Sequence, residues 1–493
     1  DRAFRFTHAL VQDVAYNGLL KKHRRDFHYR LAIDVLDDTV RRREPELIAL
    51  HLTNAGEPAL AIEYWKAAAH RSAATSANAE SINHFKQGLR LISALPGSNN
   101  RDELEFGLLV GMAQPLIAET GYTSDELERC IGDALAVGKK ISYTPDMYSL
   151  LFSQWGFKLT VGMMEDSRRV AQEFSELAER QNNEIAKYAR YRMLGASHMC
   201  LGQLQRAKDE LTVLIDDYDP KQHARLKAVY GADLCIAGRS FLSEVLWLQG
   251  NVDQAKASAA KALEEARGIE HVHSHALSLH FCSLISFLNR DKLLTRAYSD
   301  ELLAMASRHA LGAWPTLGRA MNGWAALDAD NFDVNLQMVK DGTAQACQLG
   351  VSMFIPFFYC RIAEELLSAN RLAESEDYLN QAFQLAKRTE ECVYKGEILQ
   401  LMAQLELKRG DAVKADQLFS EGLAHATGLG AASVELRVAN GYADFLLSNH
   451  NPVKATAVLN TALDHIENLV DCSDHNVSRL LLSKLEAAQA IAG

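Results

Sequence analysis

A run of histidines is the group of side chains in this sequence that comes nearest to a metal site. His271, His273 and His275 occupy alternate positions, and His280 follows them. On a helix His271 and His275 would share one face, and imidazole is a common zinc ligand. The glutamate of an HExxH motif is missing, and histidines near the start of a helix are usually solvated. A metal site and a solvated helix start are the alternatives, and we expect the second.

A phosphate-binding loop is the next candidate for chemistry. It needs GxxxxGK[ST] after a strand, since backbone amides surround the phosphates and the hydroxyl holds magnesium. Residues 132–139 have one residue too many, lie in a helical pattern and are followed by Lys140. The sequence also has no GxSxG motif, no Cys–His nucleophile and no metal-binding carboxylate pair in a strand. We therefore expect a chain that is not an enzyme and carries no cofactor or metal.

Charge and hydropathy disfavour two further classes of partner. The 493 residues carry a formal net charge of -11, and the basic runs at residues 21–25 and 41–43 are short. Nucleic-acid binding is therefore disfavoured. No window approaches about eighteen uninterrupted apolar residues, and the N-terminus is not a signal sequence, so we expect a soluble, cytoplasmic chain without a membrane partner. The eight cysteines include no CxxC, which predicts reduced, buried thiols.

The elements that position these side chains are predicted to be helices almost throughout. Nine prolines and abundant Ala, Leu, Glu, Gln and Lys favour helix over strand. Ala403, Gly410, Ala415, Phe419 and Gly422 have the spacing of two closely crossing helices. The small residues lie at the crossing, Gly410 ends the first helix, and Phe419 fills the groove between them.

The same spacing recurs in four further places along the chain. Its turn position is occupied there by Gly202, Gly250, Asn370 and His450. The pattern resembles the tetratricopeptide repeat. This resemblance implies an all-α, right-handed superhelical solenoid of tetratricopeptide-like helix pairs, about ten of them, with the first helix of each pair on the concave side.

The concave side is the predicted binding surface, because its mixture of aromatic, cationic and amide side chains suits the capture of a peptide or protein. The inward positions, counted from the repeat register, are Arg192, Glu244, Trp247, Phe357, Glu364, Gln400, Gln404, Lys408, Arg437, Asn440 and Asp444. Trp247 and Phe357 could equally be core between adjacent repeats. Residues 353–359 are apolar on every side, and are either enclosed between helices or the most apolar part of the groove.

The first residues resemble a second family. Residues 6–13, Phe-Thr-His-Ala-Leu-Val-Gln-Asp, are similar to the last helix of the winged-helix domain in signal-transduction ATPases with numerous domains. A Met-His-Asp type motif occupies this place in the family. The resemblance implies that His8 matches the histidine that senses the nucleotide phosphate, although Ala9 departs from the usual acid.

Residues 51–95 resemble the first repeats of bacterial proteins that join a class III nucleotide cyclase to such an ATPase. The similar features include Ala55-Gly56, residues 61–65, residues 76–80 and Leu95-Pro96. The resemblance implies a sensor or scaffold arm that binds a protein or small ligand and regulates an attached ATPase and a cyclase. The alternative is a passive scaffold that joins partner proteins and transmits no signal.

The domain organisation predicted from these patterns has five parts. They are the end of a winged helix with a bridging helix (residues 1–43, the helix over residues 23–43), the first helix pairs (44–97), divergent helical repeats (98–182), regular repeats (183–470) and a capping helix (471–493). The divergent part is expected to be helical but to keep the repeat register poorly, with Pro115 and Pro145 interrupting its apolar faces.

Overall fold

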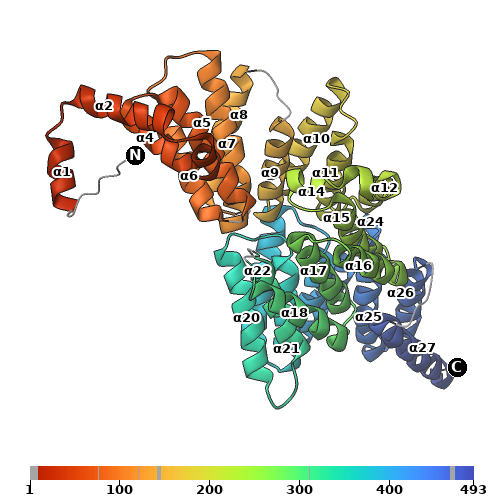
Figure 1. Cartoon of the computed structure of the whole chain (residues 1–493). Helices are drawn as coiled ribbons and strands as arrows, with labels where there is room; N and C mark the ends of the chain where they lie inside the picture. Colours follow the sequence, from red (N-terminus) through yellow and green to blue (C-terminus); the bar gives the residue numbers. More distant parts are fainter. Residues whose placement is uncertain are drawn as a thin grey trace. The chain divides into compact units, whose positions relative to one another are not determined.

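The computed structural model describes residues 9–75, 77–121, 123–141, 146–309, 311, 313–466 and 472–492, and every regular element among them is a helix (Figure 1). The predicted all-α solenoid of tetratricopeptide-like helix pairs is confirmed. Two compact units are present. The N-terminal unit contains Asp1–Thr120 and Asp125–Leu150, and the C-terminal unit contains Gly121–Ser124 and Leu151–Gly493.

Helices of the N-terminal unit are joined by short connections. They are α1 (Ala9–Asn17), α2 (Lys21–Arg30), the π-helix η1 (Leu31–Val35), α3 (Asp38–Arg43), α4 (Pro45–Ala55), α5 (Pro58–Ala74), α6 (Asn78–Ile92), α7 (Asn99–Thr120) and α8 (Asp125–Ile141). Ile48 and Leu52 of α4 pack with Trp65 of α5 in a buried cluster. Gly56 ends α4 with φ 83°, a left-handed conformation that glycine adopts without strain.

The prediction of one bridging helix over residues 23–43 is wrong. The segment forms α2, η1 and α3, because Leu36 is extended and the side chain of Asp37 accepts the amides of Thr39 and Val40 as the N-cap of a new helix. Pro115 lies inside α7, which continues through it, and its side chain is buried. Pro145 and His8 lie outside the described residues, and the winged-helix remnant and the five-part division stay predictions.

The C-terminal unit continues the series of helix pairs, and α9 begins just before it. Its helices are α9 (Asp146–Thr160), α10 (Met164–Arg180), α11 (Ala186–Cys200), α12 (Leu204–Asp217), α13 (Pro220–His223), α14 (Leu226–Tyr230), α15 (Leu234–Leu248), α16 (Val252–Arg267), α17 (Val272–Leu288), α18 (Lys292–Ala306), α19 (Trp314–Ala325), α20 (Phe332–Gln348), α21 (Ile355–Ser368), α22 (Leu372–Thr389), α23 (Lys395–Arg409), α24 (Ala412–Leu429), α25 (Ala432–Ser448), α26 (Pro452–Asp464) and α27 (Ser473–Ala492).

The repeat spacing corresponds to close helix crossings and tight turns. In the pair α21–α22, the hydroxyl of Ser375 donates to the carbonyl oxygen of Ala363 at 2.9 Å, so the predicted small residues do lie at the crossing. All five predicted turn residues have positive φ, including Asn370 at 58° and His450 at 56°. The turn positions read from the sequence are therefore confirmed.

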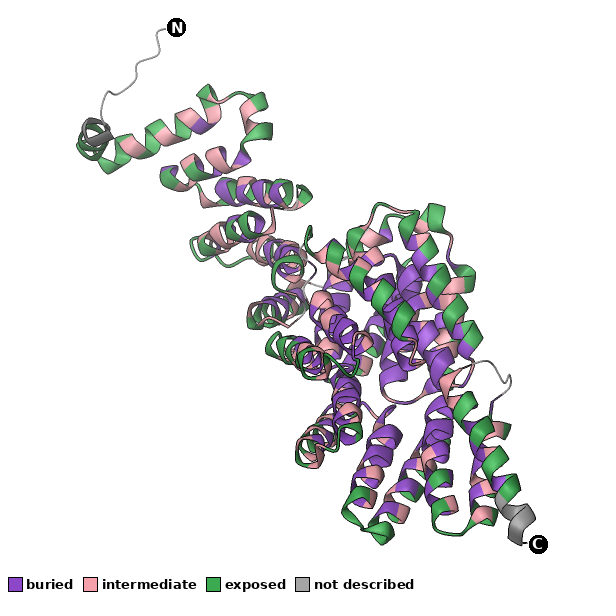
Figure 2. Ribbon diagram, turned by 90° about the horizontal axis from the view of Figure 1, so that it is seen from below, coloured by how far each residue is buried: buried purple, intermediate pink, exposed green. Residues whose placement is uncertain are grey.

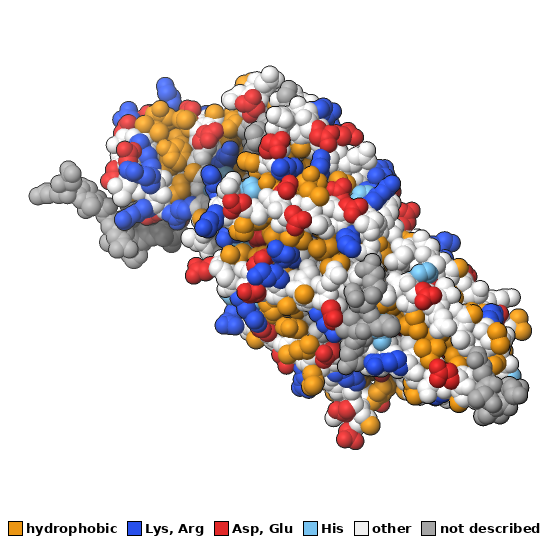
Figure 3. All heavy atoms as spheres, turned by 90° about the vertical axis from the view of Figure 1, so that its right-hand side faces the viewer, with side chains coloured by type: hydrophobic (Ala, Val, Ile, Leu, Met, Phe, Trp, Pro, Cys, Tyr) orange, Lys and Arg blue, Asp and Glu red, His pale blue; other side chains and the backbone are white. Residues whose placement is uncertain are grey.

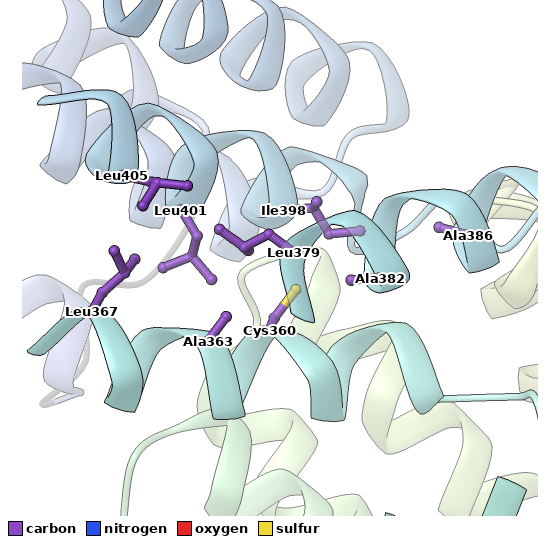
Figure 4. Close-up of a cluster of buried hydrophobic side chains, with 9 residues drawn as sticks. All are labelled: Cys360, Ala363, Leu367, Leu379, Ala382, Ala386, Ile398, Leu401 and Leu405. Carbon is purple, nitrogen blue, oxygen red and sulfur yellow. The ribbon is translucent and has the colours of Figure 1, made fainter. Parts of the chain in front are cut away.

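Apolar side chains between neighbouring pairs form the core. One cluster joins α21, α22 and α23, with Cys360, Leu379 and Leu401 pointing toward one another (Figure 4). Buried residues lie on the facing sides of the helices and exposed residues on the outer sides (Figure 2). Through the described part of the chain, no helix has the length and apolar character that crossing a membrane requires.

Candidate binding site at the seam of the C-terminal unit

Segments far apart in the sequence pack against each other within the C-terminal unit. We call the contacts between residues 160–290 and residues 351–474 the seam. The amide of Ser352 donates to the carbonyl oxygen of Thr160 at 2.9 Å, and the amide of Cys392 donates to that of Cys200 at 3.3 Å. One repeat further on, the hydroxyl of Ser433 donates to the carbonyl oxygen of Trp247 at 2.5 Å.

The turns that form one side of the seam contain glycine for two reasons. Gly162, Gly202 and Gly250 have φ of 86°, 71° and 87°, which side-chain-bearing residues rarely adopt. A Cβ on Gly202 would also lie 2.9 Å from Sγ of Cys392, and one on Gly162 would lie 2.8 Å from Cβ of Ser352. These glycines therefore let the two segments approach closely.

Two fully buried carboxyl groups lie in the middle of the seam. Glu244 of α15 accepts a hydrogen bond from the hydroxyl of Tyr394 at 2.6 Å, and its Oε2 has no partner among the described residues. Glu391 accepts the amide of Phe354 at 3.0 Å. Burial raises the pKa of Glu244 to about 8, and burial also raises the pKa of Glu391 to about 8, with a contribution from the charge of Glu244.

A buried ion network is also part of the seam. Arg437 of α25 forms ion pairs with Glu397 at 3.0 Å and Asp474 at 2.8 Å, and it donates across the seam to the carbonyl oxygen of Leu288 at 2.7 Å. Glu397 also pairs with the buried Arg361. Glu364 lies on α21 with Arg361, and it forms ion pairs with both Arg361 and Arg290 at 2.6 Å. Burial alone would raise the pKa of Glu364, but the two guanidinium groups lower it to about 2.

Most of the predicted concave residues are buried and do not line an open groove, and four of them, Glu244, Trp247, Phe357 and Arg437, make contacts across the seam. Seven are buried: Arg192, Glu244, Trp247, Phe357, Gln400, Arg437 and Asn440. Glu364 and Gln404 are partly exposed, and Lys408 and Asp444 are exposed. The indole of Trp247 donates to Asn289 at 3.2 Å, and its ring lies 5.3 Å from the guanidinium of Arg437. A binding role for these residues stays a prediction, and for the buried ones it requires the seam to open.

Burial bears on two alternatives that the sequence left open. Trp247 and Phe357 are buried, and Phe357 packs on Phe287 and Tyr394 with ring centroids 5.2 and 4.9 Å apart. Residues 353–358 are buried, so the apolar run is enclosed between helices. Arg192 is also enclosed, with its guanidinium 3.7 Å from the ring centroid of Phe241.

A cavity of about 400 Å³ lies at the outer end of the seam, and we call it the seam pocket. It is bounded by α12, by the turn between α15 and α16, by the end of α24 with the start of α25, and by the residue after α26. Its lining residues are Gln205, Lys208, Gln249, Asn251, Thr427, Gly430, Ala432, Glu435 and His465. Sequence reasoning missed all nine, because they come from turns and helix ends of distant repeats.

The lining of the seam pocket is polar and contains both charges. Glu435 is buried and accepts hydrogen bonds from the hydroxyl of Thr427 at 2.8 Å and from Nδ1 of His465 at 3.0 Å. Gln249 donates to Gln205 at 3.3 Å, while its Oε1 is buried without a partner in the described residues. Side-chain amides both donate and accept, so the pocket can bind the alternating carbonyl and amide groups of a peptide backbone.

The histidine run has separate structural roles. His271 caps α17 and accepts the amide of Ser274, so it lies before the helix and does not share a helical face with His275. His275 lies 3.4 Å from Glu301, and burial lowers the pKa of His273 to about 4 and that of His280 to about 3. Over the described ranges, no three His, Cys, Asp or Glu side chains come together as a metal-binding group.

Comparison with known proteins supports the fold. No protein-family model matches the chain. An uncharacterized protein of Rhizobium meliloti (strain 1021) is 23% identical over 443 residues, which cover 88% of this chain and 43% of the relative. The chain therefore spans less than half the length of that relative.

Two solved structures have similar helical arrangements. The Rap protein complexed with Competence and Sporulation Factor is 11% identical with a TM-score of 0.54, and the match covers 76% of this chain and 98% of Rap. The Cut9–Hcn1 hetero-tetramer of the APC/C gives 12% identity and a TM-score of 0.50, over 93% of this chain and 86% of the matched chain. Both similarities concern the fold.

Proposed function

We propose that this chain is a binding arm without catalysis, and that it holds a peptide or a small polar ligand in the seam pocket. The main observation that supports this proposal is the pocket itself. Its volume of about 400 Å³ lies within the range of ligand sites, roughly 300–1,000 Å³. The solved structures with this fold include one complexed with Competence and Sporulation Factor and one assembled with Hcn1, which supports a protein or peptide ligand.

The position of the pocket suggests how binding is transmitted. Gln205 and Lys208 line it from one side of the seam, and Thr427 and Glu435 line it from the other. A ligand that contacts both sides binds the closed seam more tightly than the open one, and it shifts the population toward the closed form. We propose that this closure regulates an attached signalling ATPase and, through it, a nucleotide cyclase, as the resemblance of residues 6–13 and 51–95 implies.

Ligand capture with matched lysine variants tests the proposed site. The chain is used to capture ligands from a lysate of its own organism, and bound material is identified by mass spectrometry. Lys208 lines the pocket, whereas Lys408 lies outside it. We expect Lys208→Ala to lose a ligand that the wild type and Lys408→Ala both retain. Retention by Lys208→Ala and by Gln249→Ala would contradict the assignment of the pocket.

A passive assembly scaffold is the second candidate function. Large apolar side chains are exposed at the starts of the second helices of several pairs, namely Leu293, Val334, Val413 and Val453. Apolar side chains lie between charged ones on the face seen in Figure 3. The full-length protein distinguishes the two functions. Equal rates of nucleotide hydrolysis with and without the captured ligand would favour the scaffold over the regulatory arm.

A further inference from the structure

The centre of the seam contains an arrangement of acids that binding at the pocket does not explain. Glu244 comes from α15 and Glu391 from the loop between α22 and α23, and both side chains are almost completely buried, at 0% and 1% exposure. Among the described residues each has one hydrogen-bond donor, which is the Tyr394 hydroxyl for Glu244 and the Phe354 amide for Glu391. The charge on one acid acts unfavourably on the other.

Among the residues that the structure describes, no cation pairs with Glu244 or Glu391. Tyr394 and Cys200 face Glu244, and both have raised pKa values there because of burial and the two acids. Cys392 is adjacent to Glu391, and His280 lies behind Phe354 with ring centroids 6.1 Å apart. The guanidinium of Arg192 acts on Cys200 and lies over the rings of Trp155 and Phe241. Glu390 and Lys395 act on Cys392.

We propose that Glu244 and Glu391 form a proton-dependent latch, which holds the seam closed while both carboxyl groups are protonated and releases it when they ionise. A buried carboxylate without a cation is strongly unfavourable, so the ionised pair regains hydration when the seam opens. The proton goes to solvent, and no other group has to react.

Opening the seam would change both binding surfaces of the C-terminal unit. The seam pocket would lose its shape because its lining comes from both sides. The buried inward residues, among them Trp247 and Arg437, would become accessible to a partner. The latch thus favours an intact seam pocket at lower pH and exposure of the buried inward residues at higher pH. It stands on the seam geometry alone and does not depend on which ligand the pocket binds.

Hydrogen exchange measured by mass spectrometry tests the latch. The amides of Ser352 and Cys392 are hydrogen-bonded across the seam, to the carbonyl oxygens of Thr160 and Cys200, so their exchange reports opening. The wild type is compared with Glu244→Gln/Glu391→Gln at each pH, which cancels the intrinsic pH dependence of exchange. Between about pH 6 and pH 8, we expect exchange in the wild type to rise relative to the variant, by about tenfold per pH unit for each proton released.

Two controls keep the test decisive. Glu365→Gln removes a carboxyl group whose pKa is also raised, mainly by burial, but which accepts its hydrogen bond from Trp324 in a neighbouring pair. This variant must keep the wild-type pH dependence. The radius of gyration of the wild type, measured by small-angle scattering, must increase over the same range. A constant radius together with equal exchange in the wild type and the double variant would overturn the latch, even if one variant folds poorly.

Discussion

The hydroxyl of Tyr394 donates a hydrogen bond to Oε1 of Glu244 at 2.6 Å, although 150 positions separate the two residues. Glu244 is on α15 and Tyr394 immediately precedes α23, so this bond joins helix pairs that are not neighbours in the repeat order. Together with the other seam contacts, it converts part of the expected groove into a packed interior.

Removing this hydroxyl should weaken the seam. Tyr394→Phe leaves one oxygen of the buried Glu244 without its donor, and an unsatisfied buried polar group costs about 1–3 kcal/mol. We expect the free energy of unfolding, measured by urea denaturation, to fall by that amount. Tyr442→Phe is the control, because the Tyr442 hydroxyl contacts Asp416 and Lys454 outside the seam. An equal loss in the two variants would argue against a special role for the Tyr394 bond.

Stability should also depend on pH in a predictable direction. The folded-state pKa values of Glu244 and Glu391, both about 8, lie above the ordinary value of 4.5. The folded protein therefore binds more protons than the unfolded chain between these values. The stability from these groups is complete below about pH 4.5 and is lost as the pH rises through 8.

Urea denaturation across this range measures the effect. Each acid lowers the free energy of unfolding by at most about 1.4 kcal/mol per pH unit as the pH rises. We expect Glu244→Gln to remove the part of this pH dependence that comes from Glu244. A wild-type protein that becomes more stable from about pH 6 to pH 8 would contradict the sign.

Two turn glycines separate the contribution of seam contact from that of backbone strain. Gly202 and Gly410 have similar φ, 71° and 88°, but a Cβ on Gly410 would meet no atom within 4 Å. Because of this backbone conformation, alanine at either position should lower the free energy of unfolding by about 1–3 kcal/mol. The methyl group of Gly202→Ala would also have to displace Cys392 and Leu429, which should lower the free energy of unfolding by about 1–3 kcal/mol more. Thermal or urea denaturation should show the larger loss for Gly202→Ala, and equal losses would mean that the turn at Gly202 is not tightly packed.

The buried ion network should be sensitive to the loss of its central acid. Glu397→Gln removes the charge shared by Arg361 and Arg437, and breaking a buried pair costs about 3–5 kcal/mol. Glu376→Gln is the matched control, because its pair with Arg409 is solvent-accessible and should contribute less than about 1 kcal/mol. The comparison uses free energies of unfolding. A loss below about 1 kcal/mol for Glu397→Gln would show that the network is dispensable.

The sequence predicted the local part of this fold well. Small residues at helix crossings and turn residues such as Asn370 and His450 depend on neighbours close in the chain, so their spacing is sufficient to find them. The sequence contains little information on the seam, because a contact such as that of Cys200 with Cys392 depends on the twist accumulated over several helix pairs. Trp247 and Arg437 have the residue types of a binding groove, but the same types stabilise a buried interface. The pocket residues, including Lys208 and Glu435, belong to no repeated pattern.

The most direct test of the closed seam is the formation of a disulfide bond across it. A Cβ at position 202 would lie 2.9 Å from Sγ of Cys392, which brings a sulfur on that Cβ within reach of a disulfide bond of about 2 Å. Gly202→Cys is oxidised under mild conditions and mapped by mass spectrometry, beside Gly410→Cys, whose position has no neighbour within 4 Å. A closed seam predicts a disulfide between positions 202 and 392 in the first variant, and none to Cys392 in the second. Absence of the 202–392 bond, or an equally fast bond from position 410, would contradict the closed seam.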